Sequence, residues 1–159
     1  KLGLWLFPGG HIEKDETPRS IKLLPRVSEK LHANFVKLPI LGTVPAGGAV
    51  ITEEAVEDWM TVEAGQIKNP AHCFVLRVRG DSMMDAGIFE GDQVIASSKK
   101  TPKNGDIVVA LVDGGSTVKR LVSGGGKRYL KAENKSYKDI YPENELEVQG
   151  VVVGLMRWY

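Results

Sequence analysis

Hydrophobic and polar residues alternate in short runs over most of this chain, and turn-forming residues separate the runs. Alternation with a period of two is typical of strands that bury one face, and Gly beside Asp or Asn indicates tight turns. The runs recur about every ten residues, which favours an all-β (mainly β) domain with coiled sheets. The expected strands cover residues 40–45, 73–79, 92–97, 106–112, 116–122, 127–132 and 147–156.

The N-terminal part of the chain has a different pattern. Leu4–Phe7 and Ser20–Leu24 predict two short strands around a loop that contains Pro and Gly. Residues 25–37 show no clean period and are interpreted as a linker. The alternating pattern therefore predicts a main domain over residues 38–159, after an N-terminal piece of residues 1–24.

Two further local signals predict a helix and a hairpin. A short helix is expected at about residues 53–58, because acidic and apolar residues follow Thr52, a possible N-cap. The run Gly124-Gly125-Gly126 lies between two expected strands and predicts a hairpin connection. A phosphate cradle is not expected there, since no helix follows the glycines.

Composition and charge limit the class of protein. With 42% hydrophobic and 26% charged residues, the 159-residue chain is typical of a soluble globular protein. Its formal net charge of +1 gives no overall field that marks a nucleic-acid or membrane binder. The longest strongly apolar run, Val151–Met156, is too short to span a bilayer, and no leader resembles a signal peptide. The single cysteine, Cys73, excludes an internal disulfide and favours a reducing, cytoplasmic location.

The candidate chemistry is a serine and a lysine. Ser82 lies in Arg-Gly-Asp-Ser-Met, and Lys119 follows it 37 residues later in Thr-Val-Lys-Arg. Serine becomes a useful nucleophile only when a base takes its proton, and a neutral lysine can do so. Lowering a lysine pKa from about 10.4 to roughly 7 needs ~4 kcal/mol, usually through burial. Strand alternation places Lys119 on the face of Thr117 and Leu121, so a buried lysine is expected there.

The surroundings of Ser82 fit a nucleophile. It follows an expected strand and a glycine, so the chain must turn and can expose the hydroxyl. The backbone N–H groups of Ser82 and Asp81 are the expected donors to an oxyanion. Each residue alone also fits a plain structural role, Ser82 in a polar turn and Lys119 as a solvated strand residue. Their combination and flanking residues favour the chemical interpretation.

A small-residue peptide bond, Ala46–Gly47, completes the set for a chain that cuts itself. Pro45 biases Val44 toward an extended conformation, Ala46 can enter a narrow pocket, and Gly47 permits close backbone approach. An ordinary turn remains the alternative for this segment. Substrate and nucleophile on one chain would give a large effective concentration.

Other chemistries find less support. The three histidines, His11, His32 and His72, have no carboxylate motif nearby to support a histidine base. Asp85, Glu90 and Asp92 lack the ligand spacing of a calcium loop and predict a solvated turn. No metal site and no cofactor are expected.

The ordered motifs together resemble the LexA-type self-cleaving repressors, which are Ser-Lys dyad peptidases. The resemblance covers about residues 38–159, and residues 18–24 also resemble the last strand of that family's winged-helix DNA-binding domain. It implies that Ser82 is the nucleophile, Lys119 the general base and Ala46–Gly47 the scissile bond. The motifs that carry it are Ala46-Gly47, Arg79-Gly80-Asp81-Ser82-Met83, Gly91-Asp92-Gln93-Val94, Gly105-Asp106-Ile107-Val108-Val109-Ala110, Thr117-Val118-Lys119-Arg120-Leu121, Ala132-Glu133-Asn134 and Gly150-Val151-Val152-Val153-Gly154-Leu155.

The resemblance implies a transcriptional repressor of the SOS DNA-damage response. Its implied partners are a second copy of the chain, with strand 147–156 pairing across the two-fold axis, and the RecA–single-stranded DNA filament, which stimulates cleavage. A buried strand is the alternative for 147–156. Operator DNA would be bound through a winged helix of which residues 1–24 are a remnant (the wing), so this chain alone is expected to bind operator weakly.

Alternative functions fall into three classes. An accessory subunit of a translesion polymerase, of the UmuD type, and a phage repressor would use the same dyad. A signal-peptidase relative shares Ser-Lys chemistry but would need a membrane anchor. A dimerisation module without catalysis is the third class, and incubation at high pH followed by mass measurement distinguishes it.

Overall fold

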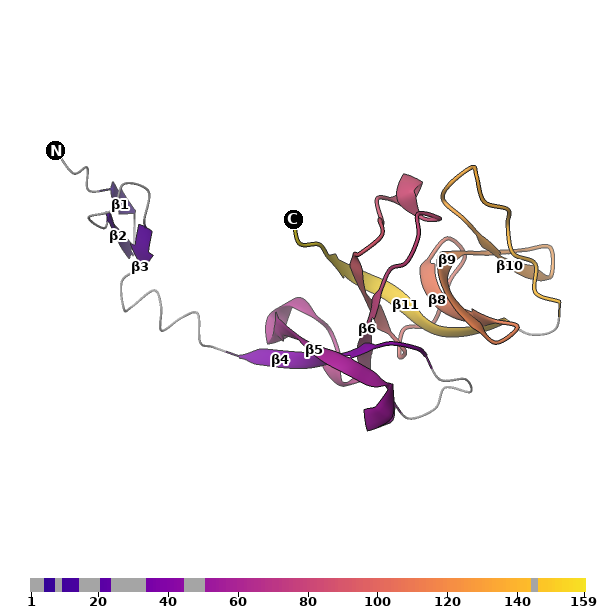
Figure 1. Cartoon of the computed structure of the whole chain (residues 1–159), viewed down its shortest axis with the longest axis horizontal. Helices are drawn as coiled ribbons and strands as arrows, with labels where there is room; N and C mark the ends of the chain where they lie inside the picture. Colours follow the sequence, from indigo (N-terminus) through magenta and orange to yellow (C-terminus); the bar gives the residue numbers. More distant parts are fainter. Residues whose placement is uncertain (1–4, 8–9, 15–20, 24–33, 45–50, 144–145) are drawn as a thin grey trace.

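The computed structural model describes residues 5–7, 10–14, 21–23, 34–44, 51–143 and 146–159 (Figure 1). For residues 5–7, 10–14 and 21–23 it describes the backbone only. The candidate scissile residues, Ala46 and Gly47, and most of the expected linker lie outside these ranges. In the described part of the chain, no helix is long and apolar enough to cross a membrane.

Eight strands form one large sheet in the order β10-β9-β8-β11-β7-β6-β4-β5. All neighbouring strands are antiparallel except β4 and β6, which are parallel. The predicted all-β fold is therefore confirmed. The strands are β4 Phe35–Leu41, β5 Val56–Glu63, β6 Cys73–Arg77, β7 Gln93–Ser97, β8 Ile107–Val112, β9 Gly115–Gly124, β10 Lys127–Lys131 and β11 Leu146–Met156.

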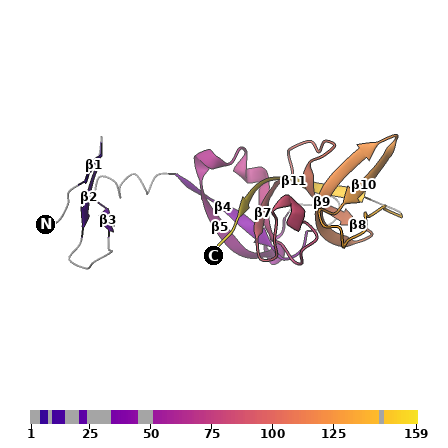
Figure 2. The ribbon, with the colours of Figure 1, turned by 90° about the horizontal axis from the view of Figure 1, so that it is seen from above.

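Strand β11 joins the two halves of the sheet. Figure 2 shows β4, β5 and β7 toward one end, β8, β9 and β10 toward the other, and β11 between them. Its first half pairs with β8 as far as Val151, and its second half pairs with β7 from Val151 onward. Gly150 lies where the register shifts, and a Cβ there would approach the Phe74 ring to 3.1 Å. A side chain at this position would therefore crowd the Phe74 ring and Ala96, which would have to shift by a few tenths of an ångström.

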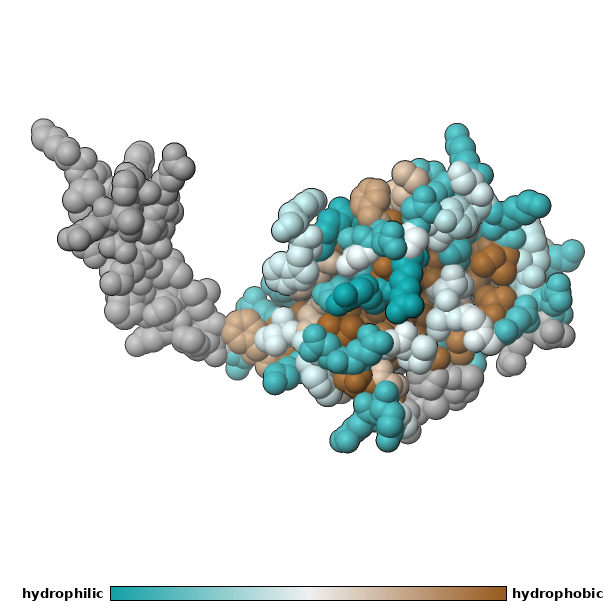
Figure 3. All heavy atoms as spheres, viewed as in Figure 1, coloured by the Kyte–Doolittle hydropathy of each residue, from teal (hydrophilic) through white to brown (hydrophobic). Residues whose placement is uncertain are grey.

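Three clusters of buried apolar side chains form the core. The cluster that matters most for the site joins the end of β4 to the segment after β6, through Val44, Val78, Met83 and Ile88. The other two lie between β4, β5, β6 and β7 and between β8, β9, β10 and β11. On the face seen in Figure 3, hydrophilic and hydrophobic residues are interspersed, as expected for sheets that bury one side.

The expected helix at 53–58 is wrong. Only one 3-10 turn forms, Glu53–Ala55, and Thr52 makes no side-chain capping bond to it. Residues 56–63 form β5, which pairs with β4 along its whole length. Alternation explains the result, because Met60 and Val62 are buried while the residues beside them are exposed.

Three further 3-10 turns connect the strands of the described chain. They lie at Ala64–Gln66, Pro70–His72 and Met84–Ala86. The Gly125–Gly126 turn joins β9 to β10 as a two-residue hairpin with positive φ at both glycines, as predicted.

The N-terminal piece forms a small antiparallel sheet in the order β1-β2-β3. Its strands are β1 Trp5–Phe7, β2 Gly10–Lys14 and β3 Ile21–Leu23. The two outer strands match the prediction, but the middle strand lies in the segment expected to be a loop. The start of the main sheet also differs, since residues 35–37 pair with β5 and so belong to β4 rather than to a linker.

Candidate active site

Ser82 lies in a tight turn after β6. Gly80 has φ +76°, a left-handed conformation that strains residues with a side chain. Directly after Ser82, Met83 is only 2% exposed and packs in the core with Ile88. The turn is therefore held by a buried side chain on one side while Ser82 itself is half-buried.

Lys119 lies in the middle of β9, opposite Val108 of β8. Its side chain is 7% exposed, and Leu121, two residues later on the same face, is 1% exposed. Arg120 points to the other face, where it pairs with Glu133. Strand alternation in the sequence therefore predicts correctly on which face of β9 Lys119 lies.

The structure brings the lysine and the serine together. Lys119 Nζ lies 2.8 Å from Ser82 Oγ, 2.8 Å from Thr117 Oγ1 and 3.0 Å from the carbonyl oxygen of Val118. Among the described residues no carboxylate lies within ion-pair distance of this amine. Burial lowers the pKa of Lys119 below its usual value, because the charged form loses hydration without gaining a counter-ion.

Three neighbours suit a neutral amine. A neutral lysine has two N–H donors and one lone pair. Thr117 Oγ1 and the Val118 carbonyl can accept the two N–H groups, which leaves the lone pair for the hydroxyl proton of Ser82. The arrangement can therefore hold the proton acceptor in line with the nucleophile.

A cavity of about 290 Å³ opens beside the pair. Ser82 and Lys119 line it together with Gly42 and Thr43, which follow β4. The next residue, Val44, is buried in the same core cluster as Met83. The described chain therefore reaches the cavity at Thr43, three residues before Ala46.

The cavity wall also offers a backbone donor. The N–H of Ser82, which lines the cavity, donates to no acceptor in the described part of the chain, whereas the N–H of Asp81 hydrogen-bonds to the phenol oxygen of Tyr137. A free donor next to a nucleophile can stabilise an oxyanion. His72 is exposed and does not line the cavity, and within the described ranges no cluster of His, Cys, Asp or Glu could hold a metal.

Sequence reasoning missed several residues around the pair. The sequence places Thr117 on the same strand face as Lys119. Its contact with the lysine amine could therefore have been predicted from their spacing of two residues. Asn134 and Tyr137 hydrogen-bond to Asp81 from more than fifty residues away. No local pattern predicts contacts over such a separation.

Comparison with known proteins identifies the family of this chain. The profile of the Peptidase S24-like family matches residues 39–153, so the chain belongs to this family. Its relatives include the LexA repressor of Caldicellulosiruptor saccharolyticus, 38% identical over 93% of this chain and 72% of that protein. The LexA repressor of Clostridium perfringens is 36% identical over 94% of this chain and 73% of that protein. One from Clostridium botulinum is 38% identical over the same shares. The resemblance inferred from the motifs is thus confirmed.

Proposed function

We propose that this chain is a LexA-like repressor that inactivates itself by cutting its own Ala46–Gly47 bond with Ser82 and Lys119. The observation that carries the proposal is the 2.8 Å contact between Lys119 Nζ and Ser82 Oγ at a cavity that the chain enters at Thr43. The S24 peptidase family and the LexA relatives support the same activity.

The reaction follows from the roles of the two side chains. Neutral Lys119 takes the hydroxyl proton while Ser82 Oγ attacks the carbonyl carbon of Ala46. The backbone N–H of Ser82 stabilises the oxyanion that forms. The lysine then gives the proton to the departing amine of Gly47, and the Ala46–Ser82 ester remains. Water, activated by the same amine, hydrolyses that ester and restores both side chains.

The intact protein must keep this reaction slow. Because the substrate lies on the same chain, its effective concentration is large whenever the cleavage segment is docked. We infer two states, one that holds Ala46–Gly47 away and one that inserts it and buries Lys119. A RecA–single-stranded DNA filament that prefers the second state by ~3 kcal/mol would raise a minor docked population over a hundredfold. Cleavage would then relieve repression in the SOS response.

The three-stranded N-terminal sheet favours a repressor over a polymerase accessory subunit. Its backbone pairing, β1 with β2 and β2 with β3, fits the end of a winged-helix domain. We assign residues 1–24 to the wing, 25–34 to the linker region and 35–159 to the peptidase and dimerisation domain. Operator DNA would be read by the winged helix.

Self-cleavage should accelerate with pH. The pKa of Lys119 is lowered but the amine is still charged below it, so the neutral fraction rises tenfold per pH unit until the pKa is passed. We expect the rate to rise from pH 7 and then level off before pH 10.5. Mass spectrometry of timed samples measures it, looking for a break between Ala46 and Gly47. Ser82→Ala is the control, and a rate independent of pH would remove the base role of Lys119.

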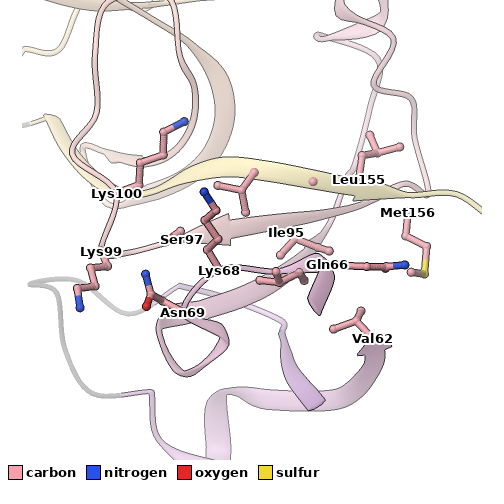
Figure 4. Close-up of a pocket in the computed structure, with 13 residues that line it drawn as sticks. Val62, Gln66, Lys68, Asn69, Ile95, Ser97, Lys99, Lys100, Leu155 and Met156 are labelled. Carbon is pink, nitrogen blue, oxygen red and sulfur yellow. The ribbon is translucent and has the colours of Figure 1, made fainter. Parts of the chain in front are cut away.

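The same domain is proposed to form a homodimer through β11. Beyond Val151 this strand pairs only with β7, so in the described structure its other edge is not covered. Val153 is 46% and Leu155 41% exposed on this half of the strand. Beside them lies a groove of about 730 Å³ with further apolar walls, Ile95 and Val62 (Figure 4). A second β11 related by a two-fold axis would pair with the free edge and cover the exposed side chains.

Leu155→Glu tests the dimer. A carboxylate at this position would be buried without a partner in both copies, so we expect association to weaken on the order of 100-fold. Sedimentation over a range of protein concentrations measures the change. Tyr141→Glu alters an aromatic residue near β10 that is even more exposed, 61% against 41%, and should leave association unchanged. A Leu155→Glu protein that associates as tightly as the wild type would rule out this interface.

A further inference from the structure

A segment far along the chain contacts the turn that carries Ser82. Asn134 Nδ2 donates to the carbonyl oxygen of Asp81 at 3.0 Å, and Tyr137 Oη donates to the Asp81 carboxylate at 2.5 Å. The backbone N–H of Asp85 donates to the carbonyl oxygen of Glu133 at 2.8 Å. These three bonds lie on both sides of Ser82, so residues 133–137 bracket the nucleophile.

The bond from Asn134 controls one particular peptide group. The carbonyl of Asp81 and the N–H of Ser82 belong to the same planar trans peptide and point in opposite directions. Asn134 and the N–H of Met84, at 3.1 Å, both hold that carbonyl. The N–H of Ser82 is thereby turned the other way, and it has no acceptor in the described chain. Donors on a carbonyl also polarise its peptide, which makes the N–H a better donor.

The same segment is tied to the strand that carries the lysine. The Glu133 carboxylate pairs with Arg120, the residue next to Lys119 in β9. At the base of the segment, Leu130 and Ile140 exchange two backbone hydrogen bonds, and Leu130 is fully buried. The segment is therefore fastened to the sheet, and it can fix where the Ser82 turn lies relative to β9.

We propose that Asn134 is a positioning residue of the peptidase, which aims the N–H of Ser82 at the oxyanion formed during cleavage. Tyr137 acts with it by holding the side chain of Asp81. This inference rests on the proposed self-cleavage and adds to it a residue that touches neither the substrate nor the reacting atoms.

Asn134→Asp is the sharpest test. Aspartate has the same shape and keeps an acceptor for the N–H of Ser136, which Asn134 Oδ1 accepts at 3.0 Å, but it loses the donor to Asp81. We expect self-cleavage to slow by about 10- to 100-fold at every pH, since a misdirected oxyanion donor acts on the transition state. The pH at which the rate levels off should stay unchanged, because the contacts of Lys119 are intact. The amide proton of Ser82 should also move upfield in the NMR spectrum as its peptide loses polarisation.

Asn104→Asp is the matched control. The side chain of Asn104 also accepts a backbone N–H, that of Ser123 at 2.8 Å, but it does not line the cavity. We expect wild-type cleavage from it. Asn134→Ala, which adds no charge, decides the question if Asn134→Asp fails to fold.

Two results would overturn the proposal alone while wild-type cleavage persists. One is a wild-type rate in the Asn134 variants, and the other is a shifted pH profile, which would mean that Asn134 acts through Lys119. A wild-type chain that never cuts itself, even at pH 10, would overturn the proposed function and this inference together. Thermal melting of each variant separates loss of positioning from loss of the fold.

Discussion

Replacing Lys119 with methionine is expected to abolish self-cleavage and to make the folded protein more stable. The loss of activity follows because Ser82 then has no base to take its proton, and the hydroxyl of Thr117, which also contacts the amine, is not a base that could replace it. Removing one member of a nucleophile–base pair typically costs 10⁴-fold or more in rate. The fraction cut after long incubation at pH 9, followed by mass spectrometry, measures the effect.

The gain in stability follows from the cost of burying an amine. The pKa of Lys119 is lower in the folded chain than its usual value, so the unfolded chain holds the proton more tightly. Below the folded pKa the burial of charge destabilises the fold, and this cost disappears as pH rises toward the unfolded value of about 10.4. Lys119→Met should therefore add on the order of 1 kcal/mol at pH 7 and little at pH 10.5.

Urea unfolding in a Ser82→Ala background measures this difference without self-cleavage. Lys131→Met, on the exposed side of β10, is the matched control and should change stability at neither pH. An equal gain at both pH values would mean that packing, rather than the charge, explains it. A loss at pH 7 would show that the hydrogen bonds of the amine outweigh its desolvation.

The features that the sequence predicted correctly were local. Alternation in β9 was enough to place Lys119 on the buried face with Leu121, because a strand has a fixed period of two. The turn at Gly80 was expected from glycine after a strand, and the glycine pair after Gly124 predicted its hairpin. These signals depend on neighbours in sequence and need no tertiary context.

The errors arose where tertiary pairing decided the outcome. Residues 53–58 have a helix-like start, but pairing of Met60 and Val62 with β4 draws the segment into a strand. The sequence also did not predict the middle N-terminal strand, β2, because this segment becomes a strand through its pairing with β1 and β3. Ala46 and Gly47 lie outside the described residues. Their role as the scissile bond stays a prediction, which rests on the sequence motif and on the position of Thr43 at the cavity.

The acidic residues after Ser82 are a further case in which tertiary contacts, rather than the local sequence, decide the structure. The sequence predicted a solvated turn for Asp85, Glu90 and Asp92, yet Asp92 is 1% exposed. Its carboxylate accepts bonds from Arg157 and from the backbone N–H of Phe89 at 2.7 Å. The partner comes from 65 residues later, so nothing near Asp92 in the sequence indicates that this carboxylate is buried.

Replacing Arg157 with methionine should destabilise the fold strongly. Arg157 Nε and Nη2 donate to the two oxygens of Asp92 at 2.6 and 2.7 Å, and Nη2 also donates to the Gly87 carbonyl at 2.8 Å. Removing one partner leaves a buried carboxylate without its counter-ion, which typically costs 3–5 kcal/mol. The Arg157 side chain is 27% exposed, so solvent screens part of this effect and we expect a clear loss of stability that is smaller than for a fully buried pair.

Urea unfolding of Arg157→Met across pH tests the cause as well as the size of this loss. Hydrogen bonds from Arg157 lower the pKa of Asp92, so the pair stabilises the fold above the unfolded value of about 3.9 and loses its effect as pH falls through the folded pKa. The difference between wild type and variant should therefore shrink below pH 4. Lys100→Met is the matched control, because its pair with Asp106 is exposed and spans 3.9 Å, and it should cost less than about 0.5 kcal/mol. A difference that persists at pH 3 would assign the loss to the stacking of Arg157 on Phe89, 4.6 Å from the ring centre, rather than to the charge of Asp92.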